Sequence, residues 1–346
     1  MMTILSAKTA YPRQQQGLTL VEIMVALTIG MVLLGGVITI LVSSQQTYRV
    51  NEALARIQEN ARFAFQLLSR DIRMAGYMGC VGEGTVPVNT LNNATDYLWN
   101  FGQPIQGYEA TASGWMPAPL PTEITSPLGG RDILILRGVD GPDTPVISHP
   151  AGGVDGPGSA DLKVTVDSGL QDNDIVLVTD CLAAAIFQIT NINTSAGQDN
   201  VVHNTGTGAP GNATKNLGQS FKDGEVVRIS TRSYYVRTNS GGNAALYWKR
   251  GNAAAEELVE GVENMQIDYG VDTDGNRAAD VYQTADLVVD WENVVSVRIN
   301  LLMQSTEDNI TSQPQTYTFN GTVTTPTDRR LRKTYSTVIA LRNRAS

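Results

Sequence analysis

One uninterrupted apolar segment near the start of the chain dominates its pattern of hydrophobic and polar positions. From Leu18 to Val42 the only ionisable side chain is Glu22. A helix over these residues would be roughly 37 Å long, which exceeds the bilayer core of about 30 Å. The polar leader before it carries Lys8 and Arg13, and basic residues favour the cytoplasmic side of a membrane. The pattern therefore predicts a membrane span over 18–42, with the downstream chain outside the cytoplasm.

The following residues predict that the same helix continues as an amphipathic half over 43–77. Apolar side chains recur every three or four residues with charged residues between them, which is typical of a helix with one buried face. No proline interrupts the chain from Leu18 to Ala75, and Gly76 indicates the helix end. The predicted apolar face consists of Val50, Leu54, Ile57, Ala61, Phe65, Leu68, Ile72 and Ala75. We expect this half to pack on a globular domain.

From residue 78 onward the pattern changes to short runs of β-branched and aromatic residues, separated by Gly, Asp, Asn and Pro. The predicted strands are 132–137, 162–166, 174–179, 185–189, 225–231, 234–236, 245–248, 294–303 and 335–341. Two polar, glycine-rich segments, 82–130 and 193–219, predict long loops. The expected fold class is α+β, with the long N-terminal helix packed on a large antiparallel β-rich domain over 78–346.

Composition narrows the range of partners. The net charge is −9 and the isoelectric point is near 4.8, which disfavours generic nucleic-acid binding. One basic cluster precedes the last predicted strand, and charge at a strand end explains it better than a DNA contact does. This cluster consists of Arg329, Arg330, Arg332 and Lys333.

The two cysteines, Cys80 and Cys181, both lie in the part of the chain predicted to be outside the cytoplasm. In that compartment a disulfide is favoured over two free thiols. Closing a loop of about 100 residues would stabilise the fold by up to about 4.7 kcal/mol in the chain-entropy model. Two buried thiols are the alternative.

Oxygen-bearing side chains crowd one predicted turn. The candidate ligands are Asp272, Asp274, Asn276 and Asp280. Closely spaced hard oxygen ligands on a turning loop suit Ca²⁺. The EF-hand pattern is not met, because Arg277 and Gln283 stand where that pattern requires glycine and glutamate. The sequence leaves two interpretations open, a calcium site and a metal-free Asp/Asn/Gly turn.

No catalytic motif is present, so we expect no enzymatic activity. Residues 206–211 match Gly-x-Gly-x-x-Gly, but Pro210 and the polar residues after it disfavour the helix that nucleotide binding needs. We expect a flexible loop there. His149 and His203 are the only histidines, and both are expected in polar loops far from each other. That arrangement supports neither zinc ligation nor a nucleophile–base pair.

The start of the apolar segment carries a family resemblance. Gly17 followed by an apolar residue, with Glu22 at the fifth position after the glycine, resembles the class III signal of type IV pilins and type II secretion pseudopilins. The resemblance implies that prepilin peptidase removes residues 1–17 by cleavage between Gly17 and Leu18, and that Leu18 is then N-methylated. Many members have Phe where this chain has Leu18. A secretory signal peptide is disfavoured, because the apolar run is too long.

Glu22 is the residue that separates a filament subunit from a simple membrane anchor. A carboxylate inside a membrane span is costly. In a filament it would pair with the methylated amine of a neighbouring Leu18, or with its own amine before assembly, and so set the register. Such pairing offsets the desolvation of both charges. A plain anchor fits the length of the segment but leaves Glu22 without a purpose.

Three further stretches, 63–79, 228–236 and 258–267, are similar to the PilW group of type IV pilus minor pilins. This resemblance implies a subunit that takes part in priming pilus assembly and sits at or near the tip complex. The implied partners are other minor pilins, the major pilin, prepilin peptidase, the inner-membrane assembly platform and a large tip adhesin. The implied location is the inner membrane as a single-pass protein, then the pilus at the cell surface. The alternatives are a J-type pseudopilin of a type II secretion system and a membrane-tethered periplasmic binding or enzymatic domain.

Overall fold

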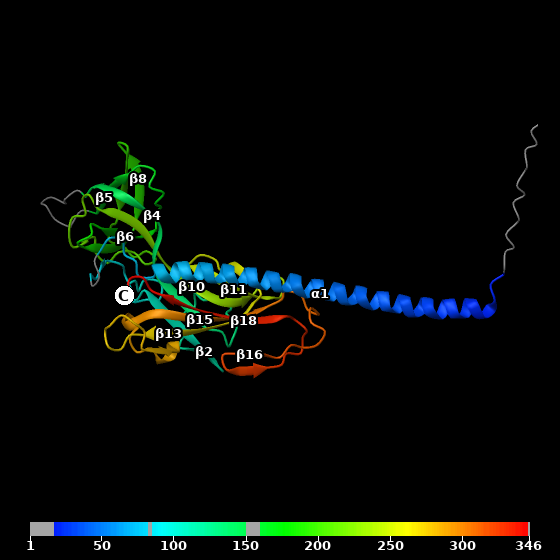
Figure 1. Ribbon diagram of the computed structural model, residues 1–346. Coiled ribbons are helices and arrows are strands. Elements are labelled where there is room, and N and C mark those ends of the chain that lie inside the picture. Colours follow the sequence, from blue (N-terminus) through cyan, green and yellow to red (C-terminus); the bar gives the residue numbers. More distant parts are fainter. Residues whose placement is uncertain (1–16, 82–84, 150–159, 345–346) are drawn as a thin grey trace, which may run out of the picture. The chain divides into compact units, whose positions relative to one another are not determined.

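The computed structural model describes residues 17–81, 85–149 and 160–344, and it divides into two compact units, Met1–Glu52 and Ala53–Ser346. One helix, α1 (Leu20–Met74), begins in the first unit and ends in the second (Figure 1). It begins two residues after the predicted start at Leu18 and ends three residues before the predicted bound of 77. Residues 1–16 of the predicted leader lie outside the described residues. The unit boundary falls inside α1, so the second half of the helix belongs to the β-rich unit.

The amphipathic half of α1 packs on the β-rich unit through small and aliphatic side chains. This buried stripe consists of Ala53, Ile57, Ala61, Ala64, Leu68 and Ile72. Leu54 and Phe65, which the pattern predicted in the stripe, are only partly buried, and the alanines one position earlier take their places. Because alanine ends at Cβ, the helix backbone can approach the neighbouring elements closely. The predicted face is therefore confirmed at Ile57, Ala61, Leu68, Ile72 and Ala75, whereas Val50, like Leu54 and Phe65, is only partly buried.

Gly76 ends α1 as predicted, and the backbone geometry explains why glycine is needed. Its φ is +72°, a left-handed conformation that glycine adopts without strain. Its N–H donates to the carbonyl of Arg137 at 2.9 Å, and a Cβ there would lie 2.9 Å from Pro104. The helix therefore ends where Gly76 contacts Arg137 of strand β4 and Pro104.

Two long antiparallel strands, β4 and β10, form the spine of a 12-stranded sheet. At one end β10 pairs with β6, and at the other end it pairs with β11. The first half of β4 pairs with β2 and its last residues pair with β5. The strands of this sheet are β1 (Val88–Asn89), β2 (Ile105–Thr111), β3 (Gly114–Met116), β4 (Ile133–Ser148), β5 (Asp161–Thr165), β6 (Ile175–Thr179), β7 (Ala184–Gln188), β8 (Asn191–Ser195), β9 (Gln198–Val202), β10 (Glu225–Thr238), β11 (Ala244–Arg250) and β12 (Glu256–Glu260).

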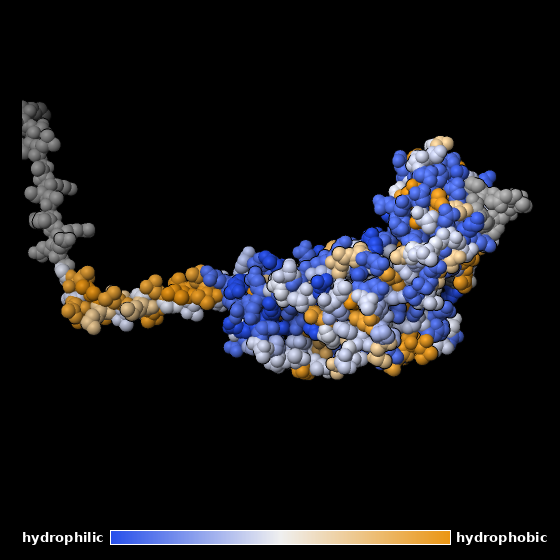
Figure 2. Space-filling model, turned by 180° about the vertical axis from the view of Figure 1, so that it is seen from behind, coloured by the Kyte–Doolittle hydropathy of each residue, from blue (hydrophilic) through white to orange (hydrophobic). Residues whose placement is uncertain are grey.

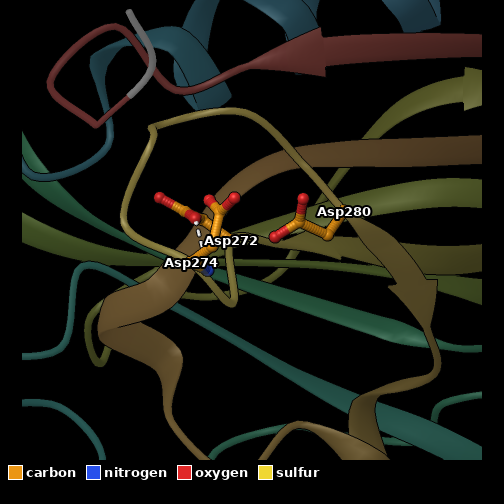
Figure 3. A group of neighbouring side chains, drawn as sticks. All are labelled: Asp272, Asp274 and Asp280. Atoms are coloured by element: carbon orange, nitrogen blue, oxygen red, sulfur yellow. Dashed lines mark hydrogen bonds between the residues drawn. The ribbon is translucent and has the colours of Figure 1, made fainter.

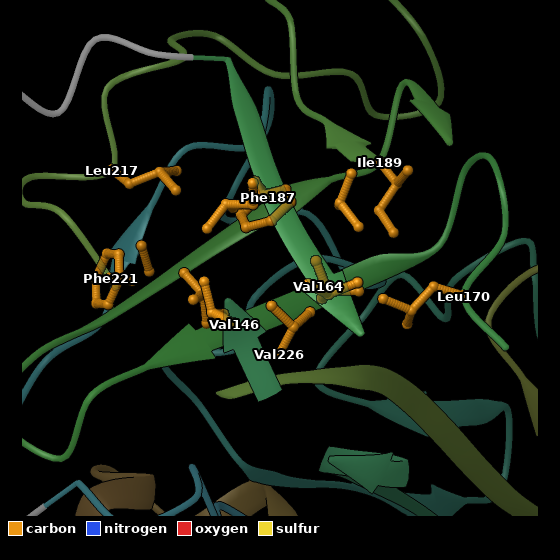
Figure 4. Packing of buried hydrophobic residues seen from close by; sticks show 13 residues of the cluster. Val146, Val164, Leu170, Phe187, Ile189, Leu217, Phe221 and Val226 are labelled. Atoms are coloured by element: carbon orange, nitrogen blue, oxygen red, sulfur yellow. The ribbon is translucent and has the colours of Figure 1, made fainter. Parts of the chain in front are cut away.

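Each end of the spine has its own hydrophobic cluster. At one end Val146 of β4 and Val226 of β10 pack with Phe187 and Phe221 among side chains of β5, β6, β7 and β9 (Figure 4). At the other end Ile133 and other residues of β2, β4, β10 and β11 form a second cluster. Burial of these side chains is the main driving force that holds the strands together.

A second, four-stranded sheet has the order β14-β13-β15-β18. Its strands are β13 (Val262–Val271), β14 (Val281–Gln283), β15 (Val294–Gln304) and β18 (Arg332–Ala340). Two short 3₁₀ helices, η1 (Ala285–Leu287) and η2 (Trp291–Asn293), connect β14 to β15, and β16 (Tyr317–Phe319) pairs with β17 (Thr322–Thr324). The predicted strands 294–303 and 335–341 are confirmed as β15 and β18, whereas β12, β13 and β14 were not predicted.

The prediction of two long loops was wrong in part. The segment 82–130 contains β1, β2 and β3, and the segment 193–219 contains the end of β8 and all of β9. A turn at Ala196-Gly197, with φ values of 52° and 76°, joins β8 to β9 as expected for a tight hairpin turn. Asn193 accepts a hydrogen bond from Asn200 across the pair at 3.0 Å. These strands were missed because polar side chains cover β8, so the sequence carries no clear hydrophobic alternation there.

Candidate functional site

The first turn of α1 is closed by a reciprocal cap between Thr19 and Glu22. The backbone N–H and the hydroxyl of Thr19 both donate to Oε2 of Glu22 at 2.9 Å. In return the N–H of Glu22 donates to the Thr19 hydroxyl at 3.3 Å. This is the capping box, in which Thr and Glu three positions apart satisfy the free N–H groups of a helix start. Glu22 therefore has hydrogen-bond partners within its own chain, and the Thr-x-x-Glu spacing in the sequence could have revealed them.

The apolar half of α1 buries none of its most hydrophobic window within the protein, and α1 is long and apolar enough to cross a membrane. Its polar side chains are satisfied locally: Thr39 donates to the carbonyl of Gly35 at 2.8 Å, and Thr28 donates to the carbonyl of Met24. Such hydrogen bonds remove the cost of a free hydroxyl in hydrocarbon. In Figure 2 this part of the helix is almost entirely hydrophobic on the visible face.

The predicted disulfide between Cys80 and Cys181 is present, with a Cα–Cα distance of 4.7 Å. Cys80 follows α1 by six positions, and Cys181 lies in the turn between β6 and β7. The bond therefore joins the end of the helix directly to the sheet, across 101 positions of sequence.

The structure brings three of the four candidate calcium ligands together in the loop between β13 and β14 (Figure 3). One carboxylate oxygen from each of Asp272, Asp274 and Asp280 lies within 4.8 Å of the others. Asn276 donates its side-chain N–H to Asp274 at 3.0 Å, and its side-chain oxygen accepts the N–H of Ala278. The group therefore consists of three carboxylates, which are hard oxygen donors, and Asn276 meets it through its side-chain N–H.

The same oxygens also organise the loop without a metal. Asp272 accepts the N–H groups of Gly275 and Arg277, each at 2.7 Å. Asp280 accepts the N–H and the hydroxyl of Thr273, also at 2.7 Å. These hydrogen bonds hold the pKa of the Asp280 carboxyl below its usual value. A carboxylate oxygen has two lone pairs, so it can accept an N–H and still coordinate a cation. The residues therefore fit both interpretations.

The expectation that the two histidines lie far apart in polar loops was wrong. Their ring centroids are 6.2 Å apart, and the side chains are buried, with 7% of His149 and none of His203 exposed. His203 packs on the ring of Phe187, and Nδ1 of His149 accepts the N–H of Phe221. Pairing of β5 with β9 brings the two segments together, and no local sequence pattern encodes that pairing.

The glycine-rich loop 206–211 is held in place by hydrogen bonds, which corrects the expectation of a flexible loop. Asn92 donates to the carbonyls of Gly206 and Pro210, and the N–H of Gly211 donates to the side chain of Gln188 at 2.7 Å. A Cβ on Gly211 would lie 2.2 Å from the carbonyl oxygen of Gly206. The glycines thus serve close backbone packing.

The basic cluster at the start of β18, of which Arg332 and Lys333 lie in the strand, does not form one charged surface. Arg332 is 4% exposed and pairs with Glu263 and Asp328, each at 2.6 Å. Arg330 donates to two backbone carbonyls, those of Ser305 and Thr306. This supports the interpretation of the cluster as structural charge at a strand end.

A buried acidic cluster at the junction of the two sheets was not found from the sequence. Asp132, just before β4, accepts the N–H of Ala110 in β2 at 2.9 Å and the N–H of Ile267 in β13 at 2.8 Å. Burial raises the pKa of Asp132 from 3.8 to about 7, although both hydrogen bonds oppose the shift. Burial and the charge of Asp132 raise the pKa of Glu109 to about 8. Tyr269 lies beside them, 1% exposed.

Two family models match this chain. Residues 233–343 match the type IV pilus-assembly protein W model, PilW, and residues 12–38 match the prokaryotic N-terminal methylation motif. No curated protein matches the chain. Among solved structures, a type IV-like pilin from Thermus thermophilus is similar at a TM-score of 0.31 and 10% identity, over 84% of this chain and 100% of that chain.

The two family matches fall on the start of α1 and on the C-terminal part of the β-rich unit. The methylation motif includes Gly17, Leu18 and the Thr19–Glu22 cap, and the PilW match runs from the second half of β10 through β18. The chain therefore combines a PilW-family segment with the methylation motif of prepilins, and these two matches support a minor pilin role in a type IV pilus.

Proposed function

We propose that this minor pilin primes pilus assembly and sits at or near the pilus tip. In this proposal prepilin peptidase cleaves between Gly17 and Leu18, the new terminus at Leu18 is methylated, and α1 holds the subunit in the inner membrane until assembly. Other minor pilins, the major pilin, the assembly platform and a large tip adhesin are the proposed partners. The role is mechanical, so no catalytic residue is invoked.

The observation that carries the proposal is an acidic side chain at the start of a helix whose most hydrophobic window is not buried by any of the residues that the structure describes. Such a surface must be covered by lipid or by the helices of neighbouring subunits. A neighbouring Leu18 amine would supply the counter-charge for Glu22 in the dry filament core.

The capping box allows a sharp test of the pairing, because Gln can replace Glu as the capping side chain. Glu22→Gln keeps the cap and removes the charge. Thr19→Ala removes the hydroxyl of the cap and keeps the charge. The proposal predicts that Glu22→Gln is lost from sheared surface pili, whereas Thr19→Ala and the exposed control Glu59→Ala are recovered in them. Normal recovery of Glu22→Gln would refute the pairing.

Processing is tested at Gly17. A Cβ on Gly17 meets no atom within 4 Å, so a larger side chain there does not disturb the fold. We expect Gly17→Leu to remain at full length in the membrane, while a Gly30→Ala control is shortened normally, as read by mass spectrometry of the amino terminus. A shortened, methylated Gly17→Leu chain would contradict the proposed cleavage.

Two alternatives are distinguished by phenotype. A J-type pseudopilin would show loss of secretion of folded proteins on deletion, with surface pili unchanged. A membrane-tethered binding domain would keep its function in the Glu22→Gln variant. The proposal requires that deletion reduces surface pili.

We also propose that the protein binds a calcium ion, which is supported by the convergence of Asp272, Asp274 and Asp280. These carboxylates and the side-chain oxygen of Asn276 would hold the ion and so fix the β13–β14 loop. Calcium should raise the Tm of the full chain in a concentration-dependent way, because a ligand that binds only the folded state stabilises it. Asp274→Ala should abolish this rise in Tm. The control Asp143→Ala, which changes an exposed carboxylate of β4, should leave the rise unchanged. A Tm that does not change with calcium concentration would contradict the calcium site and favour the metal-free Asp/Asn/Gly turn.

A further inference from the structure

A small crevice in the β-rich unit lies between the amphipathic half of α1 and strands β4, β10, β11 and β12. Its volume is about 160 Å³. Its lining combines two leucines and two aromatic residues, Leu67, Leu258, Tyr234 and Trp248, with guanidinium and carboxylate groups. The charged lining residues are Arg70, Asp71, Asp140, Arg232 and Arg250.

Most of these charges are already paired. Arg232 lies 3.3 Å from Asp71 and 2.8 Å from Asp140, and these side chains are at most 16% exposed. Arg250 lies 3.1 Å from Asp140. Its guanidinium lies over the ring of Trp248, with Cζ 4.9 Å from the ring centroid. Tyr234 donates its hydroxyl to Asp71.

Arg70 is the exception, since it forms no ion pair with any residue in the described ranges. Three guanidinium groups therefore face two carboxylates, which leaves the crevice with a surplus positive charge. Arg250 is half-exposed, at 47%, and pairs through one nitrogen only, so it retains free N–H donors toward solvent. The unsatisfied donors thus belong to Arg70 and Arg250, at the open side of the crevice.

The dimensions and lining decide the kind of occupant. Pockets that hold free small molecules are typically about 300–1,000 Å³, so this crevice is too small to enclose one. It can hold a carboxylate on a short methylene stem, with the stem against the apolar lining and the oxygens on the guanidinium groups. We propose that the crevice receives a glutamate or aspartate side chain from a neighbouring protein chain, which pairs with Arg70 and Arg250.

Butyrate reproduces a glutamate side chain and serves as the probe, with the neutral butyramide as its isostere and sulfate as an anion without a stem. The full chain in detergent is titrated while the indole N–H resonance of Trp248, assigned with Trp248→Phe, is followed by NMR. Butyrate should shift this resonance saturably, and butyramide and sulfate should not. Arg70→Gln should weaken butyrate binding by about fivefold or more, and Arg73→Gln, a nearby exposed arginine outside the crevice, should leave it unchanged.

A second experiment, in cells, tests whether the carboxylate belongs to a neighbouring subunit of the pilus. Arg70→Glu should reduce recovery of the protein in sheared pili, and Arg73→Glu should not. Absence of butyrate binding, equal binding of sulfate, or no effect of Arg70→Gln overturns the inference. Butyrate binding with normal recovery of Arg70→Glu also overturns it, because the occupant is then not a side chain of a neighbouring subunit. The Glu22→Gln result tests the filament role separately, so either conclusion can fail alone.

Discussion

The acidic cluster at the sheet junction makes the stability of the β-rich unit depend on pH in an unusual direction. Asp132 is 2% exposed, and its pKa is raised from 3.8 to about 7. A carboxyl group whose pKa is higher in the folded state contributes full stability below its unfolded pKa and loses that contribution as the pH rises toward the folded pKa. We therefore expect the free energy of unfolding to fall between about pH 4 and pH 7.

The size of the fall in the free energy of unfolding follows from the pKa shift of Asp132. Each unit of pKa corresponds to about 1.4 kcal/mol, so the shift at Asp132 gives an upper bound of about 4 kcal/mol across this window. About half of that falls between pH 5 and pH 7. Glu109, which is more exposed, extends the decline toward pH 8 by a smaller amount, because solvent screens its charge. Carboxyl groups with lowered pKa values act below about pH 4, outside this window.

Urea unfolding of the full chain in detergent at pH 5, 6, 7 and 8 measures the effect. Trp291 is a suitable reporter, because its ring contacts Tyr269 at 4.8 Å between centroids. Asp132→Asn should be destabilised by about 1–3 kcal/mol at pH 5, where an amide cannot accept both backbone N–H groups. The difference between the two proteins should shrink by about 1–2 kcal/mol by pH 8. This comparison removes the contribution of every group whose pKa is the same in both proteins, and the remainder belongs to Asp132 and to Glu109, whose pKa depends on the Asp132 charge.

Two results would refute this reasoning. One is a wild-type stability that is constant or rises between pH 5 and pH 8. The other is an Asp132→Asn variant whose pH dependence equals that of the wild type. An exposed control, Asp143→Asn, should keep the wild-type pH dependence.

Three further predictions concern stability, and each is measured by thermal or urea unfolding of the full chain. Replacing Cys80 and Cys181 together by Ser should lower the free energy of unfolding by about 2–4 kcal/mol, and reductant should have the same effect on the wild type only. Gly107→Ala should destabilise by about 1–3 kcal/mol, because a Cβ there would lie 2.1 Å from the hydroxyl oxygen of Tyr269; an unchanged Tm would show that the tyrosine moves freely. Arg137→Met should cost about 3 kcal/mol or more, since the buried guanidinium, 1% exposed, donates to three acceptors of the 85–130 segment, and a neutral effect would contradict that anchoring role.

Features encoded by neighbouring residues were the ones that the sequence could predict. The helix ends follow from apolar periodicity and from Gly76, and the convergence of Asp272, Asp274 and Asp280 follows from their spacing on one loop. The Thr19–Glu22 cap is equally local, because the two residues are three positions apart, but it was not predicted. The role of Glu22 in assembly stays a prediction.

Features that depend on strand pairing could not be predicted. Glu109, Asp132 and Tyr269 become neighbours only because β2, β4 and β13 meet at the sheet junction. Arg70 and Arg250 line one crevice only because α1 packs beside β11. In each case the chemistry belongs to residues more than 20 positions apart, and no pattern in the sequence marks them as partners, unlike the lone pair of cysteines.

The bond between Cys80 and Cys181 also determines how a pull along α1 would travel through the β-rich unit. Tension that leaves the end of the helix reaches the turn after β6 through a covalent link, so the 101 positions between the two cysteines carry little of it. Strand β6 lies beside the spine strand β10, and the load is therefore delivered to the best-paired part of the sheet. A subunit built in this way can be drawn by its helix while the long segment that follows remains folded.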